Sequence, residues 1–448
     1  MYNSMSNAFI QVGNAKYGLL NQFRKNIGSI ELNSDDLFHD LLLEKKILTK
    51  REDEEKILIE RQYKRNVLCF DNSHMDLSIC PTLGCNFQCP YCFEHTQKDV
   101  VFMSSETISD LVSFIRSFQS LKSISVTWYG GEPTINHAFE IVREITHRIK
   151  NLDLQFKEGG LITNAYLLGK DKIDQLNDLN INNVQITIDG PQETHDARRI
   201  LASGGPTFHR IMDNIDTLMN SSYSGNCNIR VNLDQANLAS FFRIREYLLE
   251  RYKGKKLTVY AGHVDTTTDK DKDSNCNLCA QEWTDFTIKQ FRKLSIPSGE
   301  GVYPLGAIFN ICSANTKNSF VIGPEGELYK CWEDVGQENM VVGNVSSDTP
   351  FNNNELVALY STGTDPFLDQ ECKECSVFPI CSGGCANRRL RAKYFNEDGM
   401  EYCSLYKLNL QTYLTEYYDA FQTKEFCSQV LGKEVTAWED NGYRVIHD

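Results

Sequence analysis

Three cysteines stand close together in the first quarter of the chain, in the order Cys85-Asn-Phe-Gln-Cys89-Pro-Tyr-Cys92. Three thiolates on one short loop can hold three corners of a 4Fe–4S cluster, which leaves the fourth iron open to a small ligand. A structural zinc site usually takes four ligands in paired C-x2-C knuckles, and a thiolate four residues upstream does not make that geometry. The spacing therefore favours an iron–sulfur cluster with one exchangeable position.

A second set of cysteines lies towards the C-terminus. It begins with a pair that flanks a predicted hairpin over residues 319–329, continues as C-x2-C-x5-C-x3-C, and ends with a single cysteine. A zinc ribbon would use the C-x2-C pair but would leave most of the other thiols unexplained. The set consists of Cys312, Cys331, Cys372, Cys375, Cys381, Cys385 and Cys403.

Composition limits the classes of partner. The chain has 448 residues, 16 cysteines and a formal net charge of −14. That charge should repel nucleic acid and anionic lipid, so neither is an expected partner. Residues 1–23 lack the pattern of a secretory signal, and no apolar run approaches the ~18 residues of a membrane span. We therefore expect a cytoplasmic protein with reduced thiols, in which cysteine clusters bind metal or take part in catalysis.

The elements that must position the first cysteines alternate between strand and helix. Apolar runs predict strands, and helical spacing of apolar residues predicts helices between them. Repeated strand–helix units require parallel pairing, with ligands at the carboxyl ends of the strands. Six strands are too few for a full barrel, so we expect a partial barrel or an open sheet. The strands are predicted over residues 75–79, 124–128, 160–163, 184–188, 229–232 and 257–261, and the helices over 105–118, 138–149, 172–179, 208–218 and 238–251.

Apart from this region, the chain divides into smaller parts. We expect an N-terminal α+β module over residues 1–74, either a winged-helix-type peptide-binding unit or a packing extension, with helices over 35–48 and 52–65. The barrel covers 75–265. A bridging region over 266–310, a cysteine-rich domain over 311–410 and a C-terminal helix and tail over 411–448 complete the chain.

The first cysteine loop resembles that of the radical S-adenosylmethionine (radical SAM) superfamily, whose C-x3-C-x-aromatic-C signature is matched in full. The resemblance implies a partial (β/α)6 TIM barrel and a SAM-binding 4Fe–4S cluster on Cys85, Cys89 and Cys92. It also implies that an electron donor such as flavodoxin or ferredoxin drives cleavage of SAM to a 5′-deoxyadenosyl radical. Tyr91 occupies the aromatic position that lies against the adenine in the family.

Further motifs follow the predicted strands, where this family binds SAM. A Gly-Gly-Glu-Pro motif matches the segment that holds the methionine amino group. Thr163-Asn164-Ala165 departs slightly from the usual Thr-Asn-Gly. The segment from Thr187 to Arg199 resembles an Asp-Gly-Pro and His-Asp-x-x-Arg pattern, although a cluster of ion pairs at a helix start is an equal alternative. The SAM contacts implied by the resemblance are Tyr91, Gly130, Gly131, Glu132, Pro133, Asn164, Thr187 and Arg199.

The second cysteine set resembles the SPASM domain, an auxiliary-cluster domain of radical SAM enzymes. The resemblance implies two further 4Fe–4S clusters, three in all. The outer cluster would use Cys372, Cys375, Cys381 and Cys403, and the inner one Cys312, Cys331 and Cys385. The inner cluster then lacks one ligand. Either Cys276 or Cys279 supplies it, or one iron stays open to substrate.

Three functions remain open from the sequence. The favoured one is a maturase that cross-links a ribosomally made precursor peptide bearing a leader, through a thioether or a carbon–carbon bond. An anaerobic sulfatase-maturing enzyme, which forms formylglycine, is the second. In that family an Asp follows the cysteine equivalent to Cys331, whereas Trp332 follows it here. A non-catalytic zinc protein is the third. Candidate bases, chosen by position alone, are Asp265, His263 and Glu333.

Overall fold

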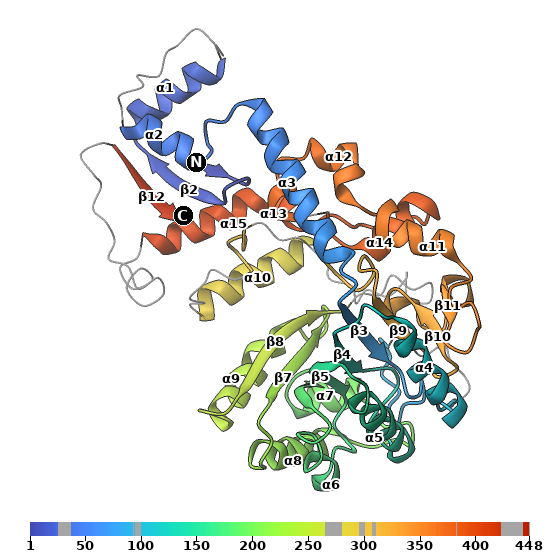
Figure 1. The fold of residues 1–448 in the computed structure, drawn as a ribbon. Coiled ribbons are helices and arrows are strands. Elements are labelled where there is room, and N and C mark those ends of the chain that lie inside the picture. The colour runs from blue at the N-terminus through green and yellow to red at the C-terminus, as the bar shows by residue number, and fades with distance from the viewer. Residues whose placement is uncertain are drawn as a thin grey trace. The chain divides into compact units, whose positions relative to one another are not determined.

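The computed structural model describes residues 1–25, 37–92, 94, 100–264, 280–294, 301–306, 311–381, 383–422 and 442–447. The chain forms two compact units. The barrel unit comprises Cys69–Leu278 and Cys312–Thr364, and the terminal unit comprises Met1–Leu68, Cys279–Ile311 and Asp365–Asp448. Figure 1 shows the elements of both units. The first part of the predicted cysteine-rich domain thus groups with the barrel, and the domain boundaries given above stay a prediction.

All six predicted strands are present and parallel. Their order in the sheet follows their order in the chain, as the right-handed crossover rule leads one to expect. Most of these strands are longer than predicted by one or a few residues at an end. The strand predicted over residues 160–163, for example, has nine residues. The strands are β3 (His74–Ile79), β4 (Ser123–Trp128), β5 (Gln155–Thr163), β6 (Ile181–Thr187), β7 (Asn226–Leu233) and β8 (Leu257–His263).

Helices connect these strands (Figure 1). The predicted helix over 172–179 is wrong in length, because only α6 (Lys170–Ile173) is helical and the chain continues in turns. Asn177, Asp178 and Asn180 favour turns over helix interiors, and Asn180 has a φ of 57°. The others are α4 (Ser105–Ser117), α5 (Asn136–Lys150), α7 (Gln192–Arg198), α8 (Phe208–Met219), the 3-10 turn η2 (Leu238–Ser240) and α9 (Phe241–Arg251).

The predicted hairpin is present and joins the barrel sheet, which the sequence did not predict. It consists of β9 (Ser319–Ile322) and β10 (Glu327–Tyr329). Strand β9 runs parallel to β3, from the pair Asp76–Ser319 to the pair Ile79–Ile322. With β11 (Gly343–Asn344) the sheet has nine strands, in the order β11-β10-β9-β3-β4-β5-β6-β7-β8. The hairpin thereby covers the edge of β3 and aligns its own end with the strand that precedes Cys85.

The rest of the barrel unit consists of short elements after β10. They are the 3-10 turns η3 (Trp332–Asp334) and η4 (Glu338–Met340), the helix α11 (Asn354–Ala358) and the π-turn η5 (Leu359–Gly363). Asp334 and Tyr360 are both buried, and the Tyr360 hydroxyl donates to the Asp334 carboxylate.

The terminal unit contains a three-stranded antiparallel sheet of β1 (Tyr2–Asn3), β2 (Ala8–Val12) and β12 (Tyr443–His447), in that order. Strand β12 lies in the segment predicted to be a polar tail. Beside it, Phe38 and Leu42 bury against Ile10. The helices are α1 (Asn14–Lys25), α2 (Leu37–Glu44), α3 (Arg51–Cys69), α10 (Ala280–Leu294), the 3-10 turn η6 (Pro366–Leu368), α12 (Gln370–Lys373), α13 (Phe378–Cys381), α14 (Ala386–Tyr394) and α15 (Tyr406–Phe421).

None of the helices, as far as the chain is described, is long and apolar enough to cross a membrane.

Gly130 and Gly131 are required by the packing of the chain itself. Both have positive φ, 79° and 27°. A Cβ at Gly131 would lie 2.2 Å from the carbonyl oxygen of Gly84, and one at Gly130 would lie 2.7 Å from the Cβ of Cys80. The loop after β4 therefore lies directly against the segment that leads into Cys85, and Glu132 N donates to the Gly84 carbonyl (3.0 Å).

We predict that Gly131→Ala lowers the free energy of unfolding by about 3 kcal/mol or more, from left-handed strain together with overpacking. Gly254→Ala is the matched control, because Gly254 also has positive φ but a Cβ at that position would have nothing within 4 Å. Strain alone should cost about 1 kcal/mol there. Thermal unfolding of both variants measures the difference, and equal shifts in Tm would contradict the packing argument.

Candidate active site

The three predicted cluster cysteines lie on one loop after β3. Cys85 is exposed, Cys92 is half-buried and Cys89 is buried. The N–H of Phe87 donates to the Sγ of Cys85 (3.4 Å). Desolvation is the main reason that the pKa of Cys92 rises to about 12, with a contribution from nearby Glu94. The free thiol is therefore neutral near pH 7, and a metal must displace its proton to bind.

Glu132 ties this loop to the ends of β4 and β5. Its carboxylate is fully buried. Oε1 accepts hydrogen bonds from the N–H and hydroxyl of Thr134 and from the Thr163 hydroxyl, and Oε2 accepts from Asn164 N (2.7 Å). The Asn164 amide in turn donates to Asn86 Oδ1 (2.8 Å) within the cysteine loop. These contacts hold the predicted SAM-binding motifs in one cluster.

The turn after Asn164 has the backbone conformation that glycine adopts most easily, although Ala165 stands there. Ala165 has a φ of 59°, in the left-handed region. Its N–H donates to the Thr163 hydroxyl (2.8 Å), and its carbonyl accepts from the Asn214 amide (2.8 Å). These two hydrogen bonds hold the alanine in a conformation that explains why glycine is usual at this position of the motif.

The Tyr91 hydroxyl is held by charged groups from the next strands. It donates to Asp189 Oδ2 (2.6 Å) and accepts from Arg199 (2.7 Å), and the Asn232 amide lies at 3.4 Å. The Arg198 guanidinium lies 4.9 Å from the centre of the Tyr91 ring. It also pairs with Asp189 (3.2 Å) and with Asp234 (2.5 Å). The sequence had given Asp189 and Arg198 no role, although both lie within the motifs that it singled out.

Several polar atoms around Tyr91 remain without a partner. Within the described ranges, Asp189 Oδ1, Arg198 Nη2 and Arg199 Nε are buried and make no hydrogen bond. Buried polar groups are almost always paired, so these unpaired acceptor and donor atoms fit a polar ligand bound beside Tyr91. The ribose hydroxyls and carboxylate of SAM have the complementary donors and acceptors.

The His195–Arg199 segment contains residues that shape the backbone and residues that face Tyr91. His195 is fully buried. Its Nδ1 accepts from Asp189 N (3.3 Å), and its Nε2 donates to the hydroxyl of Thr207 (3.1 Å), which itself donates to a carbonyl. Asp196 accepts from the N–H groups at the start of α8. The first half of the motif therefore shapes the backbone, and only the two arginines face Tyr91.

A group of aromatic and acidic side chains near the cysteine loop was not predicted from the sequence. Glu94 is half-buried, with one carboxylate oxygen enclosed. Desolvation raises its pKa to about 7, against hydrogen bonds from the Tyr129 hydroxyl and the Gly131 N–H. The Tyr129 ring packs against Trp332, with centroids 5.3 Å apart. Trp332 is the residue directly after Cys331. In the sequence, the position of Tyr129 directly before Gly130 is the one hint of this group. That position does not show which residues Tyr129 contacts.

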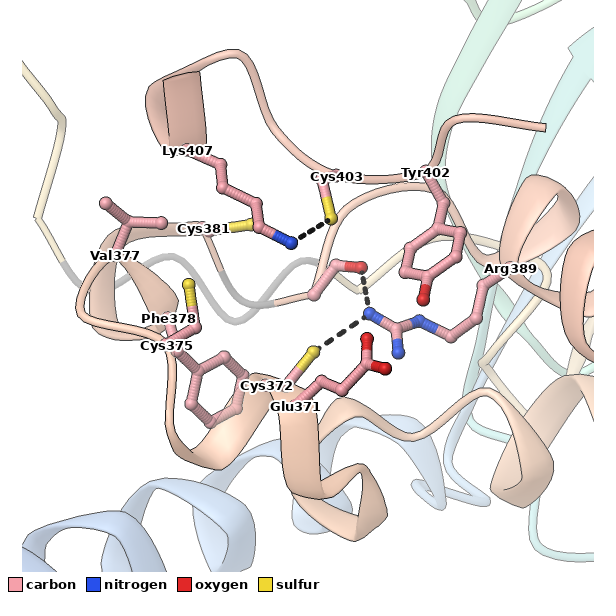
Figure 2. A pocket seen from close by; sticks show the side chains of 11 residues that line it. Glu371, Cys372, Cys375, Val377, Phe378, Cys381, Arg389, Tyr402, Cys403 and Lys407 are labelled. Atoms are coloured by element: carbon pink, nitrogen blue, oxygen red, sulfur yellow. Dashed lines mark hydrogen bonds between the residues drawn. The ribbon is translucent and has the colours of Figure 1, made fainter. Parts of the chain in front are cut away.

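Four predicted ligands of the outer cluster line one pocket of the terminal unit (Figure 2). Cys372 lies on α12, Cys375 precedes α13, Cys381 ends that helix, and Cys403 precedes α15. Gly384 is required for this arrangement, since a Cβ there would lie 1.7 Å from the Tyr402 carbonyl. Elements from separate parts of the sequence thus bring these thiols to one cavity.

The donor set of this pocket fits a 4Fe–4S cluster, because four cysteines line one cavity and each sulfur could bind a different iron. Four thiols also suit a structural zinc ion, so the identity of the metal stays a prediction.

Two of the three cysteines predicted to bind the inner cluster flank the hairpin of β9 and β10. Cys312 precedes β9 and Cys331 follows β10. Lys330 is buried between them and donates to the carbonyls of Thr316 (2.6 Å) and Ser319 (2.7 Å). Cys385 belongs to the terminal unit, so the grouping of these three thiols around one cluster stays a prediction.

Comparison with known proteins identifies the central region. A family model for the radical SAM superfamily matches residues 79–248. The chain contains a radical SAM domain. A serine-type anaerobic sulfatase-maturating enzyme from Bacteroides thetaiotaomicron is 25% identical over 77% of this chain and 90% of its own length. A cysteine-type enzyme of that name from Clostridium perfringens is 24% identical over 72% of this chain and 92% of its own length.

Solved structures share the fold. Native anSMEcpe with bound AdoMet and Cp18Cys peptide matches with a TM-score of 0.59 and 22% identity, covering 80% of this chain and 99% of that one. Streptococcus suis SuiB bound to S-adenosylmethionine matches with a TM-score of 0.52 and 16% identity, covering 87% and 86%. The predicted fold class, a partial barrel with a cysteine-rich C-terminal region, is confirmed. The N-terminal residues do not form a unit of their own, because β2 pairs with β12 from the C-terminus.

The catalytic roles suggested for the candidate bases Asp265, His263 and Glu333 stay predictions. Asp265, Cys276 and Cys279 lie outside the described residues, so the ligand that would seal the inner cluster is not placed. Glu333 is exposed on the turn after Cys331, and His263 is exposed at the end of β8.

We predict that His195 makes the radical SAM domain sensitive to acid. Burial, and then the charges of Arg199 and Arg198, lower the pKa of His195 well below its ordinary value of 6.5. The unfolded chain therefore binds a proton that the folded chain excludes. This contribution to stability is complete above about pH 6.5 and falls as pH decreases, by up to about 1.4 kcal/mol per pH unit.

His195→Gln should be less stable at pH 8 but should lose less stability between pH 6.5 and pH 5 than the unchanged protein. Denaturant unfolding across this range measures both. His209→Gln is the control, because His209 is exposed on the neighbouring helix α8. An equal loss in the His195 variant and the unchanged protein would contradict the prediction.

Proposed function

We propose that this protein is a radical SAM maturase that removes a hydrogen atom from a peptide substrate and thereby oxidises it. The observation that carries the proposal is the Cys85–Cys92 loop at the carboxyl end of β3, beside buried and unpaired polar atoms around Tyr91. A cluster on this loop, with SAM bound, supplies a 5′-deoxyadenosyl radical after one-electron reduction. The electron would come from a flavodoxin or ferredoxin.

The chain's own residues bind and orient the cofactor. Cys85, Cys89 and Cys92 would hold three irons, and the ring of Tyr91 would lie against the adenine. Arg199, Asp189 and the end of β6 near Thr187 offer partners for the ribose and carboxylate. The Gly130–Pro133 loop would hold the methionine amino group through its backbone, because the four hydrogen bonds that Glu132 accepts already engage its carboxylate.

Similar solved structures support a peptide as the substrate. The similar structures include anSMEcpe with the Cp18Cys peptide and SuiB with the precursor peptide SuiA. In the terminal unit, β2 is paired on both sides, by β1 and by β12. A leader that adds as a strand, as in other peptide-recognition modules, would therefore pair with the outer edge of β12 or of β1.

The cross-link, with a thioether favoured over a carbon–carbon bond, remains our first proposal for the product. Formylglycine formation is the second, and the sulfatase-maturating relatives favour it. Against it, Trp332 stands where that family has an Asp, and Asp334 nearby is buried and bonded to Tyr360. Only Glu333 of these acids is exposed.

We predict that the anaerobically reconstituted protein forms 5′-deoxyadenosine when it is incubated with dithionite and SAM. Changing all three of Cys85, Cys89 and Cys92 to Ala should reduce the yield at least 100-fold. Cys227→Ala is the matched control, because that thiol is buried in β7 away from the loop. Chromatography of the quenched reaction measures the yield. An unchanged yield in the triple variant would overturn the proposed function.

A second prediction separates the two products. We expect a short Cys-containing peptide encoded beside this gene to lose H2 and become resistant to thiol alkylation, with no aldehyde formed. Mass spectrometry with alkylation and hydrazide capture detects both outcomes. Hydrazide capture of a sulfatase-derived peptide, with the neighbouring peptide unmodified, would instead establish formylglycine formation.

A further inference from the structure

Arg389 lines one side of the outer cysteine pocket (Figure 2). Its side chain is 2% exposed, on α14. It donates to the Sγ of Cys372 (3.1 Å) and to the carbonyl of Gly383 (2.7 Å), and its guanidinium lies 4.4 Å from the centre of the Tyr402 ring. Figure 2 shows the guanidinium between Cys372 and Tyr402. It therefore contacts all three segments that carry the four cysteines.

A second cation lies on the opposite side of the pocket. Lys407, in the first turn of α15, donates to the Sγ of Cys403 (3.4 Å). In Figure 2 the two cations approach different thiols. Asp369 accepts from both Arg389 and Lys393, so one carboxylate is shared by two cations and the group keeps a net positive charge. Glu371 is the acid that lines the pocket itself.

We propose that Arg389 and Lys407 raise the reduction potential of the outer auxiliary cluster, and that Arg389 also positions its ligands. The inference rests on that cluster, as part of the proposed function. Cationic donors to thiolate sulfur are not needed to pack a pocket, since an apolar side chain would do so without burying a charge. They are suited to a group whose negative charge increases when it accepts an electron.

Positive charge near an iron–sulfur cluster acts on its reduction potential through electrostatics. One-electron reduction of a 4Fe–4S cluster adds a negative charge, which nearby positive charge stabilises. Hydrogen bonds to cysteine sulfur act in the same direction, because they withdraw electron density from the iron ligands. Arg389 is buried and should act strongly, whereas the exposed Lys407 is screened by solvent and should act weakly. A cluster tuned in this way is suited to accept the electron left on an oxidised substrate.

Potentiometric titration with dithionite, followed by electron paramagnetic resonance, tests the proposal on the full chain. Cys85, Cys89 and Cys92 are changed to Ala in the parent, so that the SAM cluster gives no signal. The outer cluster is the signal lost in Cys375→Ala. The four variants compared with the parent are Arg389→Gln, Arg389→Lys, Lys407→Gln and Glu371→Gln.

In Arg389→Gln the ratio of reduced to oxidised cluster at a fixed potential should fall at least tenfold, which is 59 mV for a one-electron couple. Lys407→Gln should shift it in the same direction by less. Arg389→Lys keeps the charge and should recover most of the parent value. Glu371→Gln removes a negative charge and should shift the ratio the other way.

The proposal is overturned if Lys407→Gln and Glu371→Gln both retain the parent potential at unchanged iron content, even when Arg389→Gln fails to assemble the cluster. It is overturned as well if Cys375→Ala removes no signal. Neither result would affect the formation of 5′-deoxyadenosine by protein with an intact Cys85–Cys92 loop, so failure here is separate from failure of the proposed function.

Discussion

The site depends most on the buried carboxylate of Glu132. It accepts hydrogen bonds from Thr134, Thr163 and Asn164, and so joins the ends of β4 and β5. Its backbone N–H joins the same point to Gly84, one residue before Cys85. Without this carboxylate, four buried donor groups would lose their acceptor, at a cost of about 1–3 kcal/mol each. The cysteine loop and the predicted SAM contacts would then lose their common anchor.

The two units place charged side chains in two different ways. Next to Tyr91, arginines and Asp189 leave buried atoms unpaired, which suits a ligand that enters and leaves. In the outer cysteine pocket, Arg389 is fully engaged with Cys372, Gly383 and the carboxylate of Asp369, which suits a permanent group. One chain thus contains a site with unpaired buried polar atoms and a pocket in which a buried cation is bonded to a thiol and a carboxylate.

Much of this followed from the sequence because the determinants are local. Strand and helix periodicity predicted the six-stranded sheet, and the resemblance to the SPASM domain implied which four thiols would share a pocket. The pairing of β9 with β3 and of β12 with β2 depends on segments hundreds of residues apart, and no local pattern reports it. The packing role of Gly131 and the contact of Arg389 with Cys372 also required coordinates, since their partners lie elsewhere in the chain.

Metal analysis of the anaerobically purified full chain tests the central claim most directly. The claim is that the two cysteine sets hold iron–sulfur clusters, one of them with an open iron. The account predicts brown protein with about twelve irons per chain, falling by about one third when Cys85, Cys89 and Cys92 are changed to Ala. Colourless protein that contains zinc in place of iron would contradict it.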